Sequence, residues 1–231
     1  MKKLIIILLT IYFISISVCV IAETLPSQQA EMFPDNFFIR GDTSQKEIAL
    51  TFDDGPDMKN TPKILDILKE KEIKATFFLL GKNIKKHPEI TQRISQEGHQ
   101  LANHSWSHKN FSYLKDDYIL KEEIKPTSEI IEKLTGEYPK VLRPPYGIIN
   151  NSTIQMLKEK DWIIVNWSID SNDWQLSQKQ IINIIKANHH YGGVILMHSR
   201  EDNKNTVESL PEIIRILKGK EYNFVTVNQL I

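Results

Sequence analysis

The sequence predicts an α/β fold in which parallel strands alternate with helices. Short apolar runs rich in β-branched and aromatic residues recur along the chain, and segments with helical apolar spacing separate them. About seven such repeats lie between residue 46 and the C-terminus, and polar residues follow several of the apolar runs. Strict alternation indicates parallel strands with helices packed outside, either as an open sheet or as a barrel.

Composition predicts three strands in the first half of the domain. The run 47–52 ends in an Asp-Asp-Gly-Pro turn signal, and 75–80 and 99–103 are similarly apolar. Apolar spacing predicts helices at 62–70 and 88–97, the second closed by a glycine. The pattern at residues 116–134 is also helical, and Pro126 should kink or interrupt it.

The second half continues the alternation to the end of the chain. Strands are expected at 141–143, 162–168, 194–197 and 224–227, and helices at 152–160, 177–187 and 207–217. No further linker or short repeat divides this region, so we expect a single domain over residues 46–231.

The N-terminal segment differs from the domain. Two lysines precede an apolar run at residues 4–22 that ends in Val-Ile-Ala. This predicts a signal peptide over residues 1–22 and a secreted or cell-envelope location, although the run also approaches the length of an uncleaved membrane anchor. Membrane attachment is expected only through this run. Residues 23–45 are polar with scattered Pro and Gly, and we interpret them as an extended lead-in.

Composition excludes several classes of function. The chain of 231 residues carries 29 basic and 29 acidic side chains, and cleavage after residue 22 would leave 27 against 29, a net charge of −2. This balance argues against a nucleic-acid partner, which requires a basic face. The single cysteine, Cys19, excludes an intramolecular disulfide and any multi-cysteine metal site.

Candidate metal ligands follow two of the strands. His104 and His108 are four residues apart, and Asp54 can provide a third ligand. Two histidines and one carboxylate leave coordination positions open, as in catalytic zinc sites. The alternatives are a solvated Asp-Gly-Pro turn and a histidine pair that binds no metal.

Four further residues after strand ends can complete a hydrolytic site. Water bound to such a metal can attack a carbonyl at neutral pH, and the reaction then needs a base and an acid. Asp53 is the candidate base, which Arg143 can hold ionised, and His198 is the candidate acid. Asp173 can orient His198 and raise its pKa.

Five segments together resemble the ordered motifs of the polysaccharide deacetylases, the metal-dependent carbohydrate esterases of family four that share the NodB-homology domain. These segments are residues 51–56, 104–108, 143–147, 170–174 and 196–198, and the resemblance extends from residue 47 to the C-terminus. It implies a distorted (β/α) barrel with about seven parallel strands.

The resemblance also implies the role of each site residue. One divalent metal, usually zinc, with cobalt, manganese, nickel or iron as alternatives, would be held by Asp54, His104 and His108. Asp53 tethered by Arg143 would be the base, and His198 tethered by Asp173 the acid. The backbone N–H of Tyr146 would help stabilise the oxyanion, and Trp174 and Leu196 would line the pocket for the acetyl methyl group.

The expected activity is therefore metal-dependent removal of N-acetyl groups from N-acetylglucosamine residues of a cell-wall polysaccharide, with peptidoglycan as the expected polymer. The alternatives are a deacetylase of chitooligosaccharides or xylan and a catalytically silent glycan-binding protein. A metal-storage protein would have no use for Arg143, Asp173 and a pocket tryptophan. The sequence predicts no oligomeric state.

Overall fold

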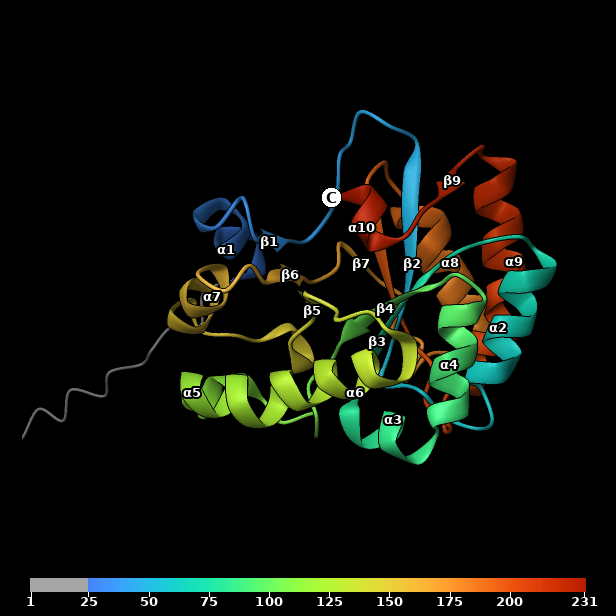
Figure 1. Ribbon diagram of the computed structural model, residues 1–231. Helices are drawn as coiled ribbons and strands as arrows, with labels where there is room; N and C mark the ends of the chain where they lie inside the picture. Colours follow the sequence, from blue (N-terminus) through green and yellow to red (C-terminus); the bar gives the residue numbers. More distant parts are fainter. Residues whose placement is uncertain (1–24) are drawn as a thin grey trace, which may run out of the picture.

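The computed structural model describes residues 25–231, so the expected signal peptide lies outside the described residues (Figure 1). The strands are β1 (Phe37–Phe38), β2 (Glu47–Asp53), β3 (Thr76–Leu79), β4 (Gln100–Asn103), β5 (Val141–Leu142), β6 (Ile163–Val165), β7 (Ile169–Asp170), β8 (Gly193–His198) and β9 (Asn223–Phe224). The α-helices are α1 (Pro26–Met32), α2 (Thr61–Glu70), α3 (Gly81–Lys86), α4 (Pro88–Gln96), α5 (Asp116–Tyr118), α6 (Lys125–Thr135), α7 (Asn151–Lys158), α8 (Gln178–Asn188), α9 (Lys204–Gly219) and α10 (Val227–Leu230). Short 3₁₀ turns lie at Phe111–Tyr113 and Pro145–Gly147, and a π-helical segment at Ile119–Ile124 joins α5 to α6.

All nine strands of the described chain form one curled sheet with parallel pairing throughout. The order is β1-β6-β5-β4-β3-β2-β8-β7, and β9 pairs with the beginning of β2. The prediction of a parallel α/β fold in the form of a distorted barrel is therefore confirmed. The sequence predicted about seven strands, and the additional ones are two-residue strands.

Alternation along β2 separates the two faces of the sheet. Ile48, Leu50 and Phe52 belong to a large buried cluster shared with the outer helices, including α2 and α9. Ala49 belongs to a second cluster inside the curl, where alanine and valine side chains from the other strands meet. Because neighbouring strand residues point to opposite faces, Asp53 lies on the same inner face as Ala49.

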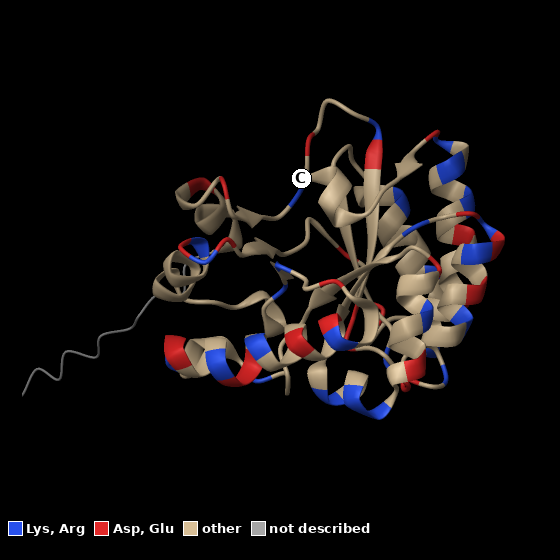
Figure 2. Cartoon of the chain, in the orientation of Figure 1, with Lys and Arg blue, Asp and Glu red and all other residues tan. Residues whose placement is uncertain are grey.

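The two ends of the curled sheet differ. At the amino end, α10 closes the interior with Val227 and Leu230, and the Val227 N–H donates to Thr76 Oγ1 at 2.9 Å. The carboxyl ends of the strands carry the loops with the candidate site residues. Basic and acidic residues are interspersed along α6 and α9 on the outside of the molecule (Figure 2). No helix within residues 25–231 is long and apolar enough to cross a membrane.

The sequence predicted that residues 23–45 form an extended lead-in, and this conformation was wrong. Residues 26–32 form α1, and β1 pairs in parallel with β6. Phe37 is buried in the cluster beneath α7, and Phe38 packs against the cluster inside the curl. The short apolar group inside the polar segment is thus an edge strand of the sheet.

Two other expected elements differ from the structure. The strand expected at 162–168 is two strands, because β6 pairs with β5 and β1 whereas β7 pairs with β8 at the other end of the strand order. Residues 166–168 thus link β6, near one edge of the curled sheet, to β7 at its other edge. The strand expected at 224–227 ends at Phe224, because Thr226 and Gln229 form a capping box that starts α10.

The helix expected at 116–134 is present, and its irregularity lies just before the proline. The chain runs through α5, the π-helical segment and α6 without leaving helical geometry. Pro126 is near the start of α6, where the missing N–H is tolerated.

Candidate active site

The first candidate residues are two adjacent carboxylates at the end of β2. Asp53 is the last residue of β2, and Asp54 adopts a left-handed backbone with φ of 72°. The Asn83 side chain donates to the Asp54 carbonyl oxygen at 2.7 Å and thereby fixes this turn. The reversal after β2 brings both carboxylates to one site, which an extended strand cannot do.

Asp54, His104 and His108 form a cluster that can hold a metal ion. Their candidate ligand atoms all lie within 4.8 Å of one another. Asp54 Oδ1 is 3.6 Å from His104 Nε2 and 3.3 Å from His108 Nε2, and this buried oxygen has no hydrogen-bond partner. Buried polar atoms are rarely unpaired, so the orphaned oxygen between two imidazoles fits a divalent cation bound there.

The two histidines belong to a loop rather than to a helix. His104 directly follows β4, and both Ser105 and His108 have positive φ angles, which coil residues 104–108 tightly. His104 Nδ1 is 2.8 Å from the Arg143 carbonyl oxygen, so Nε2 faces the cluster. Burial, together with the neighbouring His104, lowers the pKa of His108 to about 4, which keeps the ring in the neutral form that binds metals.

Asp53 and Arg143 form a buried ion pair inside the barrel. Arg143 Nη1 donates to Asp53 Oδ1 at 2.7 Å and to Thr51 Oγ1 at 2.8 Å. The remaining guanidinium nitrogens donate to the carbonyl oxygens of Val165 and Asn166, each at 3.0 Å. Burial lowers the pKa of Arg143 and the Asp53 carboxylate opposes this effect. The fixed guanidinium orients Asp53 with its second oxygen, Oδ2, 3.6 Å from His104 Nε2.

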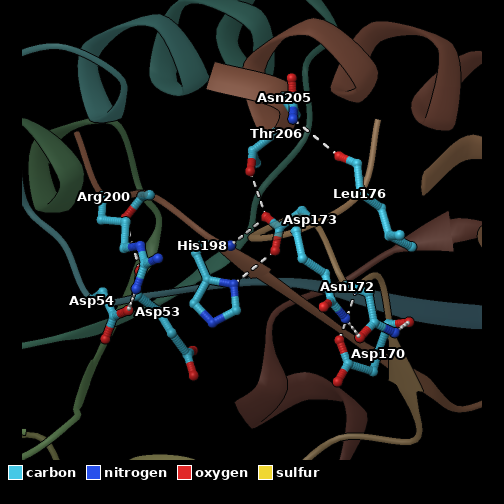
Figure 3. Close-up of polar contacts among 12 residues, drawn as sticks. Asp53, Asp54, Asp170, Asn172, Asp173, Leu176, His198, Arg200, Asn205 and Thr206 are labelled. Carbon is cyan, nitrogen blue, oxygen red and sulfur yellow. Dashed lines mark hydrogen bonds and ion pairs between the residues drawn. The ribbon is translucent and has the colours of Figure 1, made fainter. Parts of the chain in front are cut away.

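His198, on the neighbouring strand β8, and Asp173, in the turn after β7, form a second pair (Figure 3). His198 ends β8 opposite Asp53 in the parallel register. Asp173 is fully buried and accepts bonds from His198 Nδ1 at 2.7 Å, from the His198 N–H at 2.8 Å and from the Thr206 hydroxyl. Burial lowers the pKa of His198, but the Asp173 carboxylate, with Asp53 and Asp54, raises it to about 9. The imidazole is therefore protonated at neutral pH and can serve as an acid.

The structure places the other expected site residues around this centre. Tyr146 follows β5 with φ of 62°, and its ring centroid is 4.7 Å from that of His108. Leu196 is buried on β8, two residues before His198 and hence on the same face. Trp174 directly follows Asp173, and 53% of its surface is exposed. Their roles in oxyanion and methyl binding stay predictions.

Sequence reasoning missed two residues that contact the site. Arg200 Nη1 lies 3.7 Å from Asp54 Oδ2, the second oxygen of that carboxylate (Figure 3). Thr206, at the start of α9, donates to Asp173. Arg200 is only two residues beyond His198, which is a usable signal, whereas nothing in the sequence links Thr206 to a residue 33 positions earlier.

One cavity adjoins the cluster at His108, and a second shares part of its lining. The first, of about 570 Å³, is lined by His108, Tyr113, Tyr146 and Ile148 among others. The second, of about 770 Å³, shares both tyrosines and continues past Asn150 toward α1. Exposed tyrosine rings and side-chain amides in a groove suit a sugar polymer, which offers flat apolar faces and hydroxyl groups.

Comparison with known proteins gives a consistent result. The family model described as polysaccharide deacetylase matches residues 40–164. A peptidoglycan-N-acetylglucosamine deacetylase of Bacillus cereus is 45% identical over 190 residues, which covers 81% of this chain and 69% of the relative. The peptidoglycan-N-acetylmuramic acid deacetylase PdaC of Bacillus subtilis is 37% identical over 211 residues, and the match covers 91% of this chain but 44% of that protein.

A solved structure shows the same architecture. The chain superimposes on a peptidoglycan N-acetylglucosamine deacetylase crystallised with a hydroxamate-type ligand, with a TM-score of 0.82 and 42% identity. This match covers 84% of the chain and 91% of the solved structure.

Proposed function

The chain belongs to the polysaccharide deacetylase family, and from this premise we propose that it removes N-acetyl groups from N-acetylglucosamine residues of peptidoglycan. The resemblance drawn from the five sequence motifs is thereby confirmed. The relatives named above act on peptidoglycan, which supports a cell-wall polymer as the substrate. We further propose that residues 1–22 direct export, which would bring the enzyme to that polymer.

One observation carries the proposal: two oppositely charged pairs flank a cluster suited to a cation. Asp53 is paired with a buried arginine at 2.7 Å, and His198 is held as an imidazolium by a buried aspartate. Environments that keep one group basic and the other acidic at the same pH are typical of general acid–base catalysis. A metal-binding protein without catalysis has no need of both pairs.

We assign the metal to Asp54, His104 and His108, with zinc as the preferred ion because it favours two imidazoles and a carboxylate. A divalent cation held there supplies Lewis-acid chemistry, which polarises an acyl oxygen and acidifies water. Asp53 would accept the proton of the attacking water, and Arg143 would keep its carboxylate oriented. His198 would donate a proton to the departing sugar nitrogen through Nε2, since Nδ1 is bound to Asp173.

Three further residues would surround the reacting acetamide. We propose that the Tyr146 N–H donates to the developing oxyanion and that Trp174 and Leu196 contact the acetyl methyl group. The glycan chain would extend along the groove lined by Tyr113 and Tyr146. Two exposed aromatic side chains beside the site give apolar contact area for sugar rings on either side of the reacting residue.

The test measures acetate released from N-acetylglucosamine oligomers and from peptidoglycan by the metal-loaded protein. We expect release that stops after chelation and returns with zinc, and Asp53→Asn should reduce kcat by about 10²–10⁴-fold because the base is lost. Metal content and thermal unfolding of the variant provide the control for intact structure. Acetate release unchanged after complete metal removal would contradict the mechanism.

The same assay separates the alternative substrates. Peptidoglycan, chitooligosaccharides and acetylated xylan are compared at equal acetyl concentration, and we expect the highest kcat/KM on peptidoglycan. Mass spectrometry of the digested product then locates the free amine on glucosamine or on muramic acid. Binding to these glycans without any release of acetate would favour the silent glycan-binding protein.

A further inference from the structure

The loop that carries both histidine ligands, residues 104–108, is called here the histidine loop. A carboxylate from a different element, Glu123 in the π-helical segment, is inserted beneath it. We propose that Glu123 is a positioning residue that holds His108 in the geometry for metal binding. The inference rests on the proposed metal-dependent function but is tested without measuring catalysis.

Glu123 is 1% exposed and has both carboxylate oxygens occupied by the histidine loop. Its Oε2 accepts the N–H groups of Trp106 at 3.1 Å and Ser107 at 2.8 Å, and its Oε1 accepts the Ser107 hydroxyl at 2.7 Å. Hydrogen bonds to a charged acceptor are stronger than neutral ones. Two of the three residues between the histidines, Trp106 and Ser107, thus have their N–H groups bound to one buried carboxylate.

The remaining polar groups of the histidine loop are bound from other directions. The N–H groups of Gly81 and Lys82, at the start of α3, donate to the carbonyl oxygens of Ser105 and Trp106 at 3.0 and 3.1 Å. The His108 N–H donates to Ser105 Oγ at 2.9 Å. No other group takes the place of Glu123 among the described contacts, so its loss leaves the Trp106 and Ser107 N–H groups without these partners.

The two histidine ligands depend on this support to different degrees. His104 directly follows β4, and its ring is bound separately to the Arg143 carbonyl oxygen. His108 lies at the far end of the loop, where its ring meets the edge of the exposed Tyr146. The backbone conformation between the histidines therefore determines where His108 lies, and Glu123 binds that backbone.

The π-helical segment accounts for the position of this carboxylate. π-helical turns interrupt the regular α-helical spacing and often occur at functional sites. Here the turn at Ile119–Ile124 comes just before Pro126, and it buries Glu123 whereas the adjacent Glu122 is exposed. Glu122 therefore offers a matched control in the same helix with the same charge.

The experiment titrates metal-free Glu123→Ala, Glu123→Gln and Glu122→Ala with Co²⁺ in competition with a chelator of known affinity. The d–d absorption of Co²⁺ reports the coordination geometry. We expect Glu123→Ala to bind Co²⁺ about 10–100-fold more weakly with an altered spectrum, as for other residues that orient metal ligands. Glu123→Gln should lie between Glu123→Ala and the unchanged protein, because its amide oxygen still accepts the backbone N–H groups. Glu122→Ala should match the unchanged protein.

A purely structural role predicts a different result. Glu123→Ala would then lower the thermal stability of the metal-free protein but would bind Co²⁺ within twofold of the unchanged protein at a temperature where both are folded. That outcome would overturn the proposal. If Glu123→Ala does not fold, Glu123→Gln decides between the two results. Failure of the proposed deacetylation would instead appear as normal Co²⁺ binding without acetate release in the unchanged protein.

Discussion

At the scale of single residues, the site depends on buried charged groups that are each paired with an opposite charge. His198 is largely enclosed by protein, which favours the neutral ring, yet its contact with the fully buried Asp173 keeps it protonated. Asp53 is only 3% exposed, and Arg143 Nη1 lies 2.7 Å from its carboxylate, where it compensates the negative charge. Each of these two groups needs its buried partner, since an isolated buried charge is costly.

Replacing Asp173 should change the pH dependence of catalysis. His198 must carry a proton to act as the acid, so activity falls as pH rises through its pKa, which Asp173 raises to about 9. Asp173→Asn removes the negative charge and lowers that pKa, and the alkaline limb of kcat/KM should move to lower pH by about one unit or more. The measurement is a pH–rate profile from pH 6 to 10.

A second variant separates charge from hydrogen bonding. Thr206→Val removes the hydroxyl that donates to Asp173 but keeps the carboxylate charge. Its alkaline limb should move less than that of Asp173→Asn. Coincident profiles for Asp173→Asn and the unchanged protein would show that Asp173 does not control the proton of His198.

His99 makes stability depend on pH at a position away from catalysis. Burial, followed by the charge of Lys74, lowers the pKa of His99 to about 4, and its Nδ1 accepts the Ala75 N–H at 3.2 Å. The unfolded chain binds this proton near pH 6.5 and the folded chain only near pH 4. The stability that the fold gains with a neutral His99 is therefore fully present above pH 6.5. It is lost as pH falls toward 4, and the total loss in the free energy of unfolding is about 3 kcal/mol.

The test compares the free energy of unfolding of the unchanged protein and His99→Asn at several pH values between 7 and 4. Other titrating groups are common to both proteins, so the difference isolates His99. The unchanged protein should lose stability more steeply toward acid pH. Parallel curves would show that His99 is not held neutral by the fold.

At the scale of elements, the histidine loop depends on close packing against the start of α3. Trp106 lies across Gly81, where an added Cβ would be 2.2 Å from Trp106 Cε3 and 2.6 Å from Thr127 Oγ1. The missing side chain lets α3 approach closely enough to donate its first N–H groups to the loop. Trp106 is thus packed against the start of α3.

Gly81→Ala should therefore be destabilising although alanine is the better helix former. We expect a loss of about 1–3 kcal/mol in the free energy of unfolding, because the methyl group overlaps Trp106. Gly219→Ala provides the control at the end of α9, where an added Cβ meets nothing within 4 Å. That change should be neutral or stabilising by up to about 1 kcal/mol. Equal effects in chemical denaturation would contradict the packing argument.

At the scale of the whole molecule, the curl of the sheet creates the site. Arg143 follows β5 and Asp53 ends β2, with β4 and β3 between them in the sheet. In a flat sheet three strand spacings separate these positions by ~14 Å, beyond the reach of an arginine that contacts a carboxylate at 2.7 Å. The closed curvature lets the Arg143 side chain cross the interior, where it lies over the ring of Phe78.

The segment before residue 46 completes this curved sheet, and Phe37 tests its contribution. Phe37 is 1% exposed and packs with residues of β5, β6 and α7. Phe37→Ala should reduce the free energy of unfolding by about 3–5 kcal/mol, as expected for a core phenylalanine. Met32→Ala, at an exposed position of α1, should change it by less than about 0.5 kcal/mol. A loss below about 1 kcal/mol for Phe37→Ala would favour a loosely attached lead-in.

Local sequence patterns predicted most helices and strands but not which strands pair with one another. The strands and helices from Glu47 to Gly219 were largely expected, because apolar spacing depends on which face a short segment buries. The split between β6 and β7 was not, because a continuous apolar run does not reveal a change of partner strand. The role of Phe37 was missed for the same reason: two apolar residues form a strand only where a sheet edge is available.

The sequence by itself determined the chemical groups of this protein: two acids after one strand, a histidine pair, an arginine, and a His–Asp pair in five ordered motifs. These are local facts, because residue type and spacing within a motif do not depend on the rest of the chain. Only the tertiary structure decided that Asp54 Oδ1 faces both imidazoles, that Arg143 reaches Asp53 across the barrel, and that Glu123 supports the histidine loop. These contacts join residues 16 to 90 positions apart, so they exist only once sheet curvature and helix packing bring the segments together.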